Sequence, residues 1–339
     1  MRTPLLTRCG AALFGVALAA HNIPANAQSY YQGKTIEIIQ PAAAGDSYDT
    51  LSRLVARHLG RFLPGNPAII VRSMPGAGGI VAANHLYNVA AKDGTVLSMP
   101  DQSLFETQLF TPGSLKADVR KMNWIGRVIS NNAGLYAWHT AAVKKIEDTY
   151  TKELVVSSTG RASQIRWTML KNLLGVKFRL ITGHKGASEG ILAMERGEVD
   201  AVSMPWTVFR VIHAEWMREK KINVLLQTGL DGAPDLAGVP RLIDLARNDE
   251  ERTILELFSQ AEKVGRSFAA PPDMPPERVA ELRAAYAATL KDAAFLADAK
   301  AMDVTLDPMS GEAMQAMIPK FFDHPPALVA NALALTKME

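Results

Sequence analysis

The sequence predicts an α/β protein with two lobes, each a mainly parallel β-sheet flanked by helices, and a ligand cleft between them. Short apolar runs end abruptly in loops of small residues, and apolar residues then return at the spacing of an amphipathic helix. This strand, loop and helix unit recurs in both halves of the chain. The length of 339 residues also suggests two domains, because single cores rarely grow much beyond about 250–300 residues.

The first segment has the pattern of a signal peptide. Arg2 and Arg8 precede and border an apolar run at residues 11–20, and Ala25-Asn26-Ala27 has the small-x-small form of a cleavage site. We expect residues 1–27 to be cleaved after export. The apolar run is shorter than the roughly 20 residues of a membrane-spanning helix. No other run approaches that length, so the mature chain is expected to be soluble.

Charge and cysteine content narrow the function classes. The chain has 37 Lys and Arg residues against 34 Asp and Glu. Without Arg2 and Arg8 the counts are 35 and 34, a net charge of about +1, which argues against nucleic acid as a partner. The one cysteine, Cys9, falls in the expected signal peptide, so the mature chain has no disulfide, thiol catalyst or cysteine metal ligand. Cys9 comes too early for a lipoprotein anchor, and Thr7-Arg8 before it does not fit a lipobox.

The first half predicts three strands that end in small or polar loops. The expected elements are strand 36–39, loop 41–49, helix 50–62, strand 68–71, loop 74–79, helix 81–90, strand 96–99 and loop 100–103. In a parallel sheet such loops meet at the carboxyl edge, where open α/β sheets bind ligands. Free N–H groups and the positive dipole end of a helix favour anions there, so we expect a carboxylate-like ligand at these loops.

The second half repeats this logic and then returns to the first lobe. The expected elements are strand 124–129, a hinge at 131–134, strand 154–156, loop 157–163, helix 164–174, strand 178–182, loop 183–189, helix 190–197, strand 199–202, loop 203–206, strand 223–227, helix 241–258, strand 267–270, helices 276–290 and 294–302, and a last helix capped by Ser310. We expect one lobe to comprise residues 28–130 plus 263–339, and the other residues 131–262.

Several of these segments together resemble the receptor family of the tripartite tricarboxylate transporters, also called TctC-like or Bug proteins. The segments are Pro41-Ala42-Ala43-Ala44-Gly45 through Asp49, Pro64-Gly65-Asn66-Pro67, Met74-Pro75-Gly76-Ala77-Gly78-Gly79, Asp93-Gly94-Thr95, Trp124-Ile125-Gly126-Arg127, His184-Lys185-Gly186-Ala187-Ser188 and Glu195-Arg196-Gly197-Glu198-Val199-Asp200. The resemblance covers nearly all of the mature chain. It implies a two-lobed periplasmic-binding-protein fold of type II that captures a small organic acid and delivers it to a two-component membrane permease.

The resemblance also implies which loops hold the ligand. In the family, two loops of the first lobe hold a carboxylate largely through backbone N–H groups and bridging waters, and loops of the second lobe close over it. Carried over to this chain, and with the neighbouring polar loop residues added, the expected ligand-binding residues are Ala44, Gly45, Asp46, Ser47, Tyr48, Asp49, Gly76, Ala77, Gly78, Gly79, Asp101, Ser157, Thr159, Arg161, Ser163, Lys185, Gly186, Ala187, Ser188, Ser203 and Trp206.

One departure from the family bears on the ligand class. Where the family commonly has a glycine run, this chain has Gly45-Asp46-Ser47-Tyr48. A negative charge at Asp46 repels a dicarboxylate unless its side chain points away or meets a cation, so a monocarboxylate or an amine-bearing ligand fits better. Asp49 is expected to cap the helix beginning at Thr50, to contact the ligand, or both.

Other side chains have two interpretations each. Arg161 and Lys185 either meet a ligand carboxylate or are solvated, and Tyr48 and Trp206 either wall the ligand or pack in the core.

An enzyme fits the sequence poorly. The histidines show no metal-binding spacing, no Gly-x-Ser-x-Gly elbow occurs, and the glycine-rich loop matches neither a phosphate loop nor the strict dinucleotide motif. We therefore expect a binding protein without a cofactor or metal, present as a monomer. A sensor of the same architecture acting with a membrane signalling partner is the alternative. A periplasmic hydrolase would need a nucleophile with a base in reach, and the sequence suggests no such pair.

Overall fold

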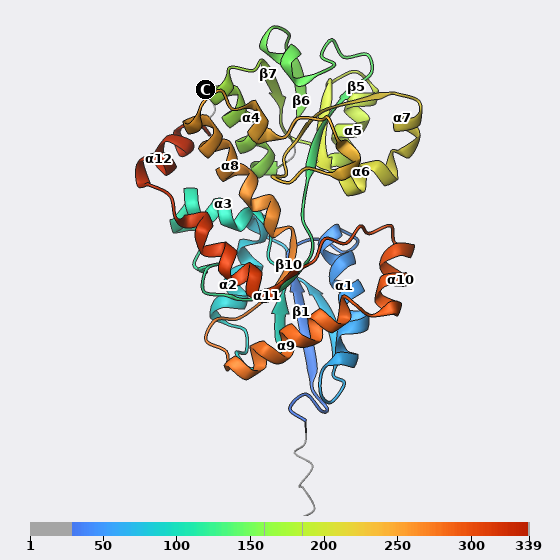
Figure 1. Cartoon of the computed structure of the whole chain (residues 1–339), viewed down its shortest axis with the longest axis vertical. Coiled ribbons are helices and arrows are strands. Elements are labelled where there is room, and N and C mark those ends of the chain that lie inside the picture. Colours follow the sequence, from blue (N-terminus) through green and yellow to red (C-terminus); the bar gives the residue numbers. More distant parts are fainter. Residues whose placement is uncertain (1–28, 159, 185, 338–339) are drawn as a thin grey trace, which may run out of the picture.

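The computed structural model describes residues 29–337 apart from residues 159 and 185, and it contains two sheets with helices on both faces of each (Figure 1). One sheet lies in the lower half of the view and the other in the upper half. We call each sheet with its helices a lobe. The predicted two-lobed α/β fold is confirmed.

The first sheet places three neighbouring strands side by side in parallel. Its strands are β1 (Thr35–Gln40), β2 (Ala68–Ser73), β3 (Val96–Ser98), β4 (Asn123–Ile129), β10 (Arg266–Ala270) and β11 (Met309–Ser310), in the order β11-β4-β10-β3-β1-β2. β1 pairs in parallel with both β2 and β3, whereas β10 is antiparallel to β3 and to β4. β1 to β4 therefore all run the same way, and β10 is inserted against them.

The second sheet repeats this plan. Its strands are β5 (Ala133–Trp138), β6 (Leu154–Ser157), β7 (Phe178–Ile181), β8 (Ala201–Pro205) and β9 (Ile222–Gln227), in the order β7-β6-β8-β5-β9. β6 is parallel to β7 and β8, and β5 is antiparallel to β8 and β9. In each sheet the inserted antiparallel strand, β10 in the first and β5 in the second, comes directly after the chain crosses from the other lobe. The carboxyl ends of the four co-directional strands form one edge of each sheet.

Helices cover both faces of the first sheet. α1 (Ser47–Leu59), α9 (Pro276–Thr289) and α10 (Ala293–Ala301) share one apolar cluster with it, and α2 (Ile80–Asn88), α3 (Ser103–Phe110) and α11 (Gly311–Met317) share the other. In α1 the buried apolar residues Leu51, Leu54, Val55 and Leu59 recur at helical spacing. Burial of that stripe holds the helix on the sheet.

The second sheet is covered in the same way. α4 (Gly160–Leu174), α8 (Asp249–Val264) and α12 (Pro326–Ala334) pack on one face, and α5 (Ala187–Glu195) and α6 (Trp206–Ile212), followed by α7 (Ala214–Arg218), on the other. β5 is buried on both faces, and its side chains alternate between them. Leu135 packs in the cluster with α4, α8 and α12, and Tyr136 packs in the cluster with α5 and α6. The sequence-based division assigns the C-terminal segment to the first lobe, yet α12 packs on the core of the second.

Short 3-10 helices complete the structure at Gly60–Phe62, Ala77–Gly79, Pro112–Ser114, Ile146–Tyr150, Pro234–Leu236, Leu242–Leu245 and Ile318–Phe322. Within the described residues, no helix combines the length and the apolar character needed to cross a membrane.

The cap expected at Asp49 is wrong. α1 begins at Ser47, and its N-cap is Asp46, whose carboxylate accepts a hydrogen bond from the Tyr48 N–H at 3.0 Å. The expected Ser310 cap is confirmed, because its hydroxyl accepts from the Ala313 N–H at 3.2 Å.

Other boundaries also differ from expectation. α4 and α5 begin at Gly160 and Ala187, so several residues expected in loops lie in first helical turns. The strand expected at 199–202 runs from Ala201 to Pro205, and the hinge expected at 131–134 overlaps the start of β5. The helix expected at 241–258 is divided into a 3-10 turn and α8, because Asn248 caps α8 by accepting from the Glu251 N–H.

Two of the three main-chain crossings between the lobes, the one from β4 to β5 and the one from α8 to β10, lie against each other; the third leads to α12. Gly265 has a φ of 53°, and a Cβ built on it would lie 2.0 Å from the carbonyl oxygen of Ile129. The Asn131 N–H donates to the carbonyl oxygen of Glu262 at 2.9 Å. Only glycine allows both this conformation and this approach, so the crossings form one compact unit.

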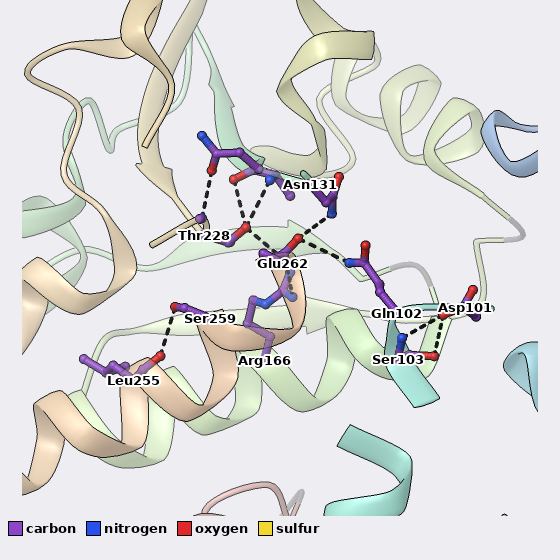
Figure 2. Close-up of polar contacts among 12 residues, drawn as sticks. Asp101, Gln102, Ser103, Asn131, Arg166, Thr228, Leu255, Ser259 and Glu262 are labelled. Carbon is purple, nitrogen blue, oxygen red and sulfur yellow. Dashed lines mark hydrogen bonds and ion pairs between the residues drawn. The ribbon is translucent and has the colours of Figure 1, made fainter. Parts of the chain in front are cut away.

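Glu262 is the polar centre of that unit (Figure 2). Its side chain is 1% exposed and pairs with Arg166 of α4 at 2.6 Å. Thr228 donates to the same carboxylate at 3.2 Å, and so does the Gln102 amide at 3.2 Å. Asn131 also donates to it. One buried carboxylate thus joins the first-lobe loop before α3, both crossings and the second lobe.

We predict that Glu262→Gln destabilises the protein strongly, by about 3–5 kcal/mol, because it leaves the Arg166 guanidinium buried without its counter-charge. Chemical denaturation monitored by circular dichroism measures the change. The matched control is Glu153→Gln, which breaks an exposed pair with Arg179 and is expected to cost less than about 1 kcal/mol. Equal effects of the two variants would contradict a structural role for the buried pair.

Candidate functional site

The carboxyl ends of three first-lobe strands meet at one place. A Cβ built on Gly79, after β2, would lie 2.6 Å from the Cβ of Asp101, after β3, and 3.4 Å from the Cβ of Pro41, after β1. The order β3-β1-β2 and the parallel pairing bring these loops together. The sequence-based expectation that they share one edge is therefore confirmed.

The glycine-rich loop adopts a run of left-handed residues. Ala77, Gly78 and Gly79 have φ values of 47°, 61° and 85°, and Gly76 has a φ of 140°. The Gly79 N–H donates back to the carbonyl of Gly76 at 3.0 Å, which closes the turn directly before α2. Gly79 is the N-cap of α2 and has no side chain that could cap it. The Ile80 N–H donates to the carbonyl of Ala77, and the start of α2 presents its positive dipole end, which suits an anion.

The N-terminus of α1 is different because the chain supplies its own anion there. The Asp46 carboxylate caps the helix, and the Asp49 carboxylate accepts from the Gly45 N–H at 3.0 Å and from Arg53 at 3.0 Å. The hydrogen bond from Arg53 is the main reason that the pKa of Asp49 lies below its usual value. Asp46 and Asp49 therefore have partners within the chain, whereas the N-terminus of α2 has no side-chain cap.

A cavity of about 670 Å³ begins at this loop and extends between the lobes. Its walls come from the glycine-rich loop, one face of α3, the start of α4 and the end of α12, and the lining residues are Ala77, Gly78, Ile80, Ser103, Glu106, Thr107, Phe110, Thr111, Ser114, Gln164, Ile165, Leu333 and Thr336. This volume is in the range of small-molecule sites. Hydroxyl groups, apolar side chains and one acid make up most of the side-chain lining.

The acid is Glu106, which lies one helical turn after Ser103 on α3. The residue is 8% exposed, and its carboxyl makes no hydrogen bond to another side chain or backbone group in the described parts of the chain. Burial raises its pKa to about 7; the Arg166 charge lowers the pKa, and the charges of Glu262 and Asp101 raise it. Glu106 thus changes its charge near neutral pH on the wall of the cavity.

Tyr48 and Trp206 pack in cores. Tyr48 is 6% exposed, lies in the apolar cluster of α1, and accepts a hydrogen bond from the Gln102 N–H at 3.2 Å. The guanidinium of Arg266 lies 3.9 Å from the centre of its ring. Trp206 is 5% exposed and lies in one cluster with Tyr136 and Phe209. Neither ring lines the cavity, so the structure supports packing for both.

The remaining first-lobe residues lie beside the cavity. Ala44 and Gly45 belong to the loop before α1, and Ser47 accepts hydrogen bonds from Arg266 at 3.1 and 3.2 Å. Asp101 accepts from the N–H and hydroxyl of Ser103 at 2.8 and 2.7 Å, which anchors the start of α3. Of the first-lobe residues expected from the sequence, Ala77 and Gly78 line the cavity.

The second-lobe residues lie at the carboxyl edge of its sheet or in the helices that follow. Ser163 is in the first turns of α4 and accepts from the Ser158 hydroxyl at 3.3 Å, Gly186 is the N-cap of α5, Ala187 and Ser188 begin α5, and Ser203 is in β8. Thr159 and Lys185 lie outside the described residues, as does the side chain of Arg161. None of the described second-lobe residues expected from the sequence lines the cavity.

One contact was not expected. The hydroxyl of Ser157 lies 2.8 Å from Nδ1 of His184, a serine and histidine within hydrogen-bond distance that the sequence did not suggest. Ser157 is 2% exposed, and a Cβ built on Gly190 of α5 would lie 2.4 Å from its hydroxyl. The hydroxyl is therefore covered by the chain. Among the described residues no cluster of three His, Cys, Asp or Glu side chains could hold a metal ion.

The contributions of α3, α4 and α12 to the cavity were not expected from the sequence. The α3 residues that line the cavity are Ser103, Glu106, Thr107 and Phe110. They recur at helical spacing, and this pattern is visible in the sequence. Leu333 and Thr336 reach the cavity because α12 crosses to the second lobe, and no local pattern indicates that crossing.

Comparisons with known proteins agree with this architecture. The chain is 27% identical over 255 residues to a UPF0065 protein encoded in the gbd 5′ region of Cupriavidus necator, covering 72% of this chain and 74% of that protein. Its fold is similar to a TctC solute-binding protein from Polaromonas, with a TM-score of 0.65, 20% identity, and coverage of 89% of this chain and 97% of that one. It is also similar in fold to MatC from Rhodopseudomonas palustris with bound malate, with a TM-score of 0.60, 18% identity, and coverage of 89% and 99%.

The model of the tripartite tricarboxylate transporter family receptor matches residues 51–323, which is most of the chain. Proteins of this family are periplasmic solute-binding receptors rather than enzymes. The chain therefore belongs to the tripartite tricarboxylate transporter receptor family.

Proposed function

We propose that this chain, once exported and freed of residues 1–27, binds one small organic carboxylate between its lobes and delivers it to a two-component membrane permease. The observation that carries the proposal is the N-terminus of α2, which has no side-chain cap and opens with Ala77 and Gly78 on the wall of a cavity of about 670 Å³. A carboxylate there accepts hydrogen bonds from backbone N–H groups and lies at the positive end of the helix dipole.

The transport role is binding without chemistry. In this proposal residues 28–130 plus 263–339 form most of the first lobe, residues 131–262 form most of the second, and the crossings at Asn131 and Gly265 act as the hinge. A ligand that contacts both lobes favours the closed arrangement over the open one, and the closed form is the one presented to the permease. The second-lobe segments 157–163, 185–188 and 203–206 are proposed to approach the ligand on closure.

Fold similarity to MatC with bound malate supports a carboxylate as the ligand class. The cavity adds a constraint of its own. Apart from Glu106, the side chains that line it are hydroxyl, amide or apolar groups, so the anchor for a ligand anion within the described lining is the α2 backbone.

The direct test is a thermal-shift screen of residues 28–339 against a panel of small mono-, di- and tricarboxylates and amino acids. A ligand that binds only the folded state raises the melting temperature by mass action, so at least one carboxylate should raise it in a concentration-dependent way. Amides or esters of the hit should give no shift, because they lack the anion. If amides and esters match the parent acids, the carboxylate anchor is wrong.

We predict that Gly78→Ala weakens binding of the hit at least tenfold. Gly78 has a φ of 61°, and the added methyl would project into the cavity about 4.0 Å from the hydroxyl of Ser103. Isothermal titration calorimetry measures the change. Gly175→Ala is the matched control: its φ is 74°, so the backbone strain is similar, and nothing lies within 4 Å of the added methyl. Unchanged affinity in Gly78→Ala would exclude this loop as the anchor.

A further inference from the structure

Glu106 introduces a constraint on the ligand that the carboxylate anchor does not explain. Glu106 is 8% exposed on the cavity wall, and its carboxyl, which reaches the cavity, makes no hydrogen bond with another group in the described part of the protein. Withdrawing a charged group largely from water without a protein partner is costly, and a bound molecule lowers that cost when it supplies a hydrogen-bond donor or a cation. Because Glu106 lies on the cavity lining, a bound ligand is in position to supply that partner.

The charged groups near Glu106 determine which kind of ligand group it can bind. Arg166 of α4 is the cation facing it, but that guanidinium is paired with Glu262 of α8 at 2.6 Å. Glu262 and Asp101, in the loop before α3, are both acids that raise the pKa of Glu106. In the described lining Glu106 is the one ionisable side chain. A second ligand carboxylate would therefore approach an acid without a lining cation to neutralise it.

Resting on the proposed carboxylate receptor, we propose that Glu106 determines the ligand class by holding the ammonium group of a small aminocarboxylate whose carboxylate lies at the N-terminus of α2. The sequence alone suggested an amine-bearing ligand or a monocarboxylate because of Asp46. Asp46 caps α1 in the structure, so in this proposal the acid that meets the ammonium group is Glu106.

The spacing of the two anchors favours an amine remote from the carboxylate. A Cβ on Gly78 would lie 4.0 Å from the hydroxyl of Ser103, and Glu106 follows Ser103 by three residues on the same helix face, about 5–6 Å further along. An α-amino acid carries both groups on one carbon, whereas an ω-amino acid of four or five carbons spans this distance. Such a chain also matches the apolar lining of Ile80, Phe110 and Ile165.

Pairs of probes that differ only in the distal group test the proposal. We would titrate residues 28–339 at pH 8 with 4-aminobutanoate and glutarate, and with 5-aminopentanoate and adipate. The aminocarboxylate of at least one pair should bind at least tenfold more tightly than its dicarboxylate. Glu106→Gln should remove that preference, whereas Glu153→Gln, at an exposed acid, should keep it. Circular dichroism and melting temperature verify that both variants fold.

The pH dependence of the wild-type protein gives a second readout that needs no variant. The ammonium group pairs with ionised Glu106, so aminocarboxylate affinity should fall as pH drops below about 7, by roughly thirty-fold between pH 8 and pH 5.5. Glu106→Gln should flatten this profile.

The outcomes separate this inference from the receptor proposal. Dicarboxylates that bind as tightly as their amino counterparts, a preference that survives in Glu106→Gln, or a hit confined to other carboxylates would each overturn the role of Glu106 and leave the receptor standing. If no carboxylate of any kind binds, the proposed function itself fails.

Discussion

The buried pair between Glu262 and Arg166 is the interaction on which the relation of the two lobes depends. Ionised groups are expensive to bury, and this carboxylate is tolerated because Arg166, Thr228, Gln102 and Asn131 all donate to it. Gln102 extends the network, since its amide oxygen accepts from Arg266 at 3.0 Å, and Arg266 in turn donates to Ser47 at the start of α1. Polar contacts thus run from the second lobe through the crossings to the first-lobe loops.

The same strand order in both sheets explains why a site forms between the lobes. Each sheet has four strands in one direction and one inserted strand that follows a crossing, and the first sheet adds the short antiparallel edge strand β11. In the first lobe this order gathers the ends of β1, β2 and β3 around Pro41, Gly79 and Asp101. Phe110 of α3 stacks on Phe258 of α8 at 5.2 Å, so α3 packs directly against the second lobe. The cavity lies along α3 for that reason.

Local patterns in the sequence predicted most strands, the glycine-rich loop and its place before a helix, because these depend on apolar spacing and on the backbone freedom of glycine. They did not predict which acid caps α1. Asp46 and Asp49 are both suitable caps, and the choice depends on Arg53 and the Gly45 N–H, which engage Asp49. Local patterns also could not decide whether Tyr48 and Trp206 contact the ligand or pack in the core, since aromatic residues near loops suit either role.

Contacts between distant segments could not be predicted from the sequence. Glu106 is buried in α3 together with Leu104, Phe105 and Phe110, and that helix packs against α8 and α12, which are distant in the sequence. Likewise, Glu262 lies in the last turns of α8, and its partners come from four other parts of the chain.

A crystal structure of residues 28–339 with a bound carboxylate is the most direct test of the proposed site. We expect the carboxylate within about 3 Å of backbone N–H groups at the start of α2, with the rest of the ligand along α3 and within reach of Glu106. A ligand seated at the N-terminus of α1 in place of the Asp46 cap, or held by the second lobe without contact to residues 77–80, would contradict the proposed site.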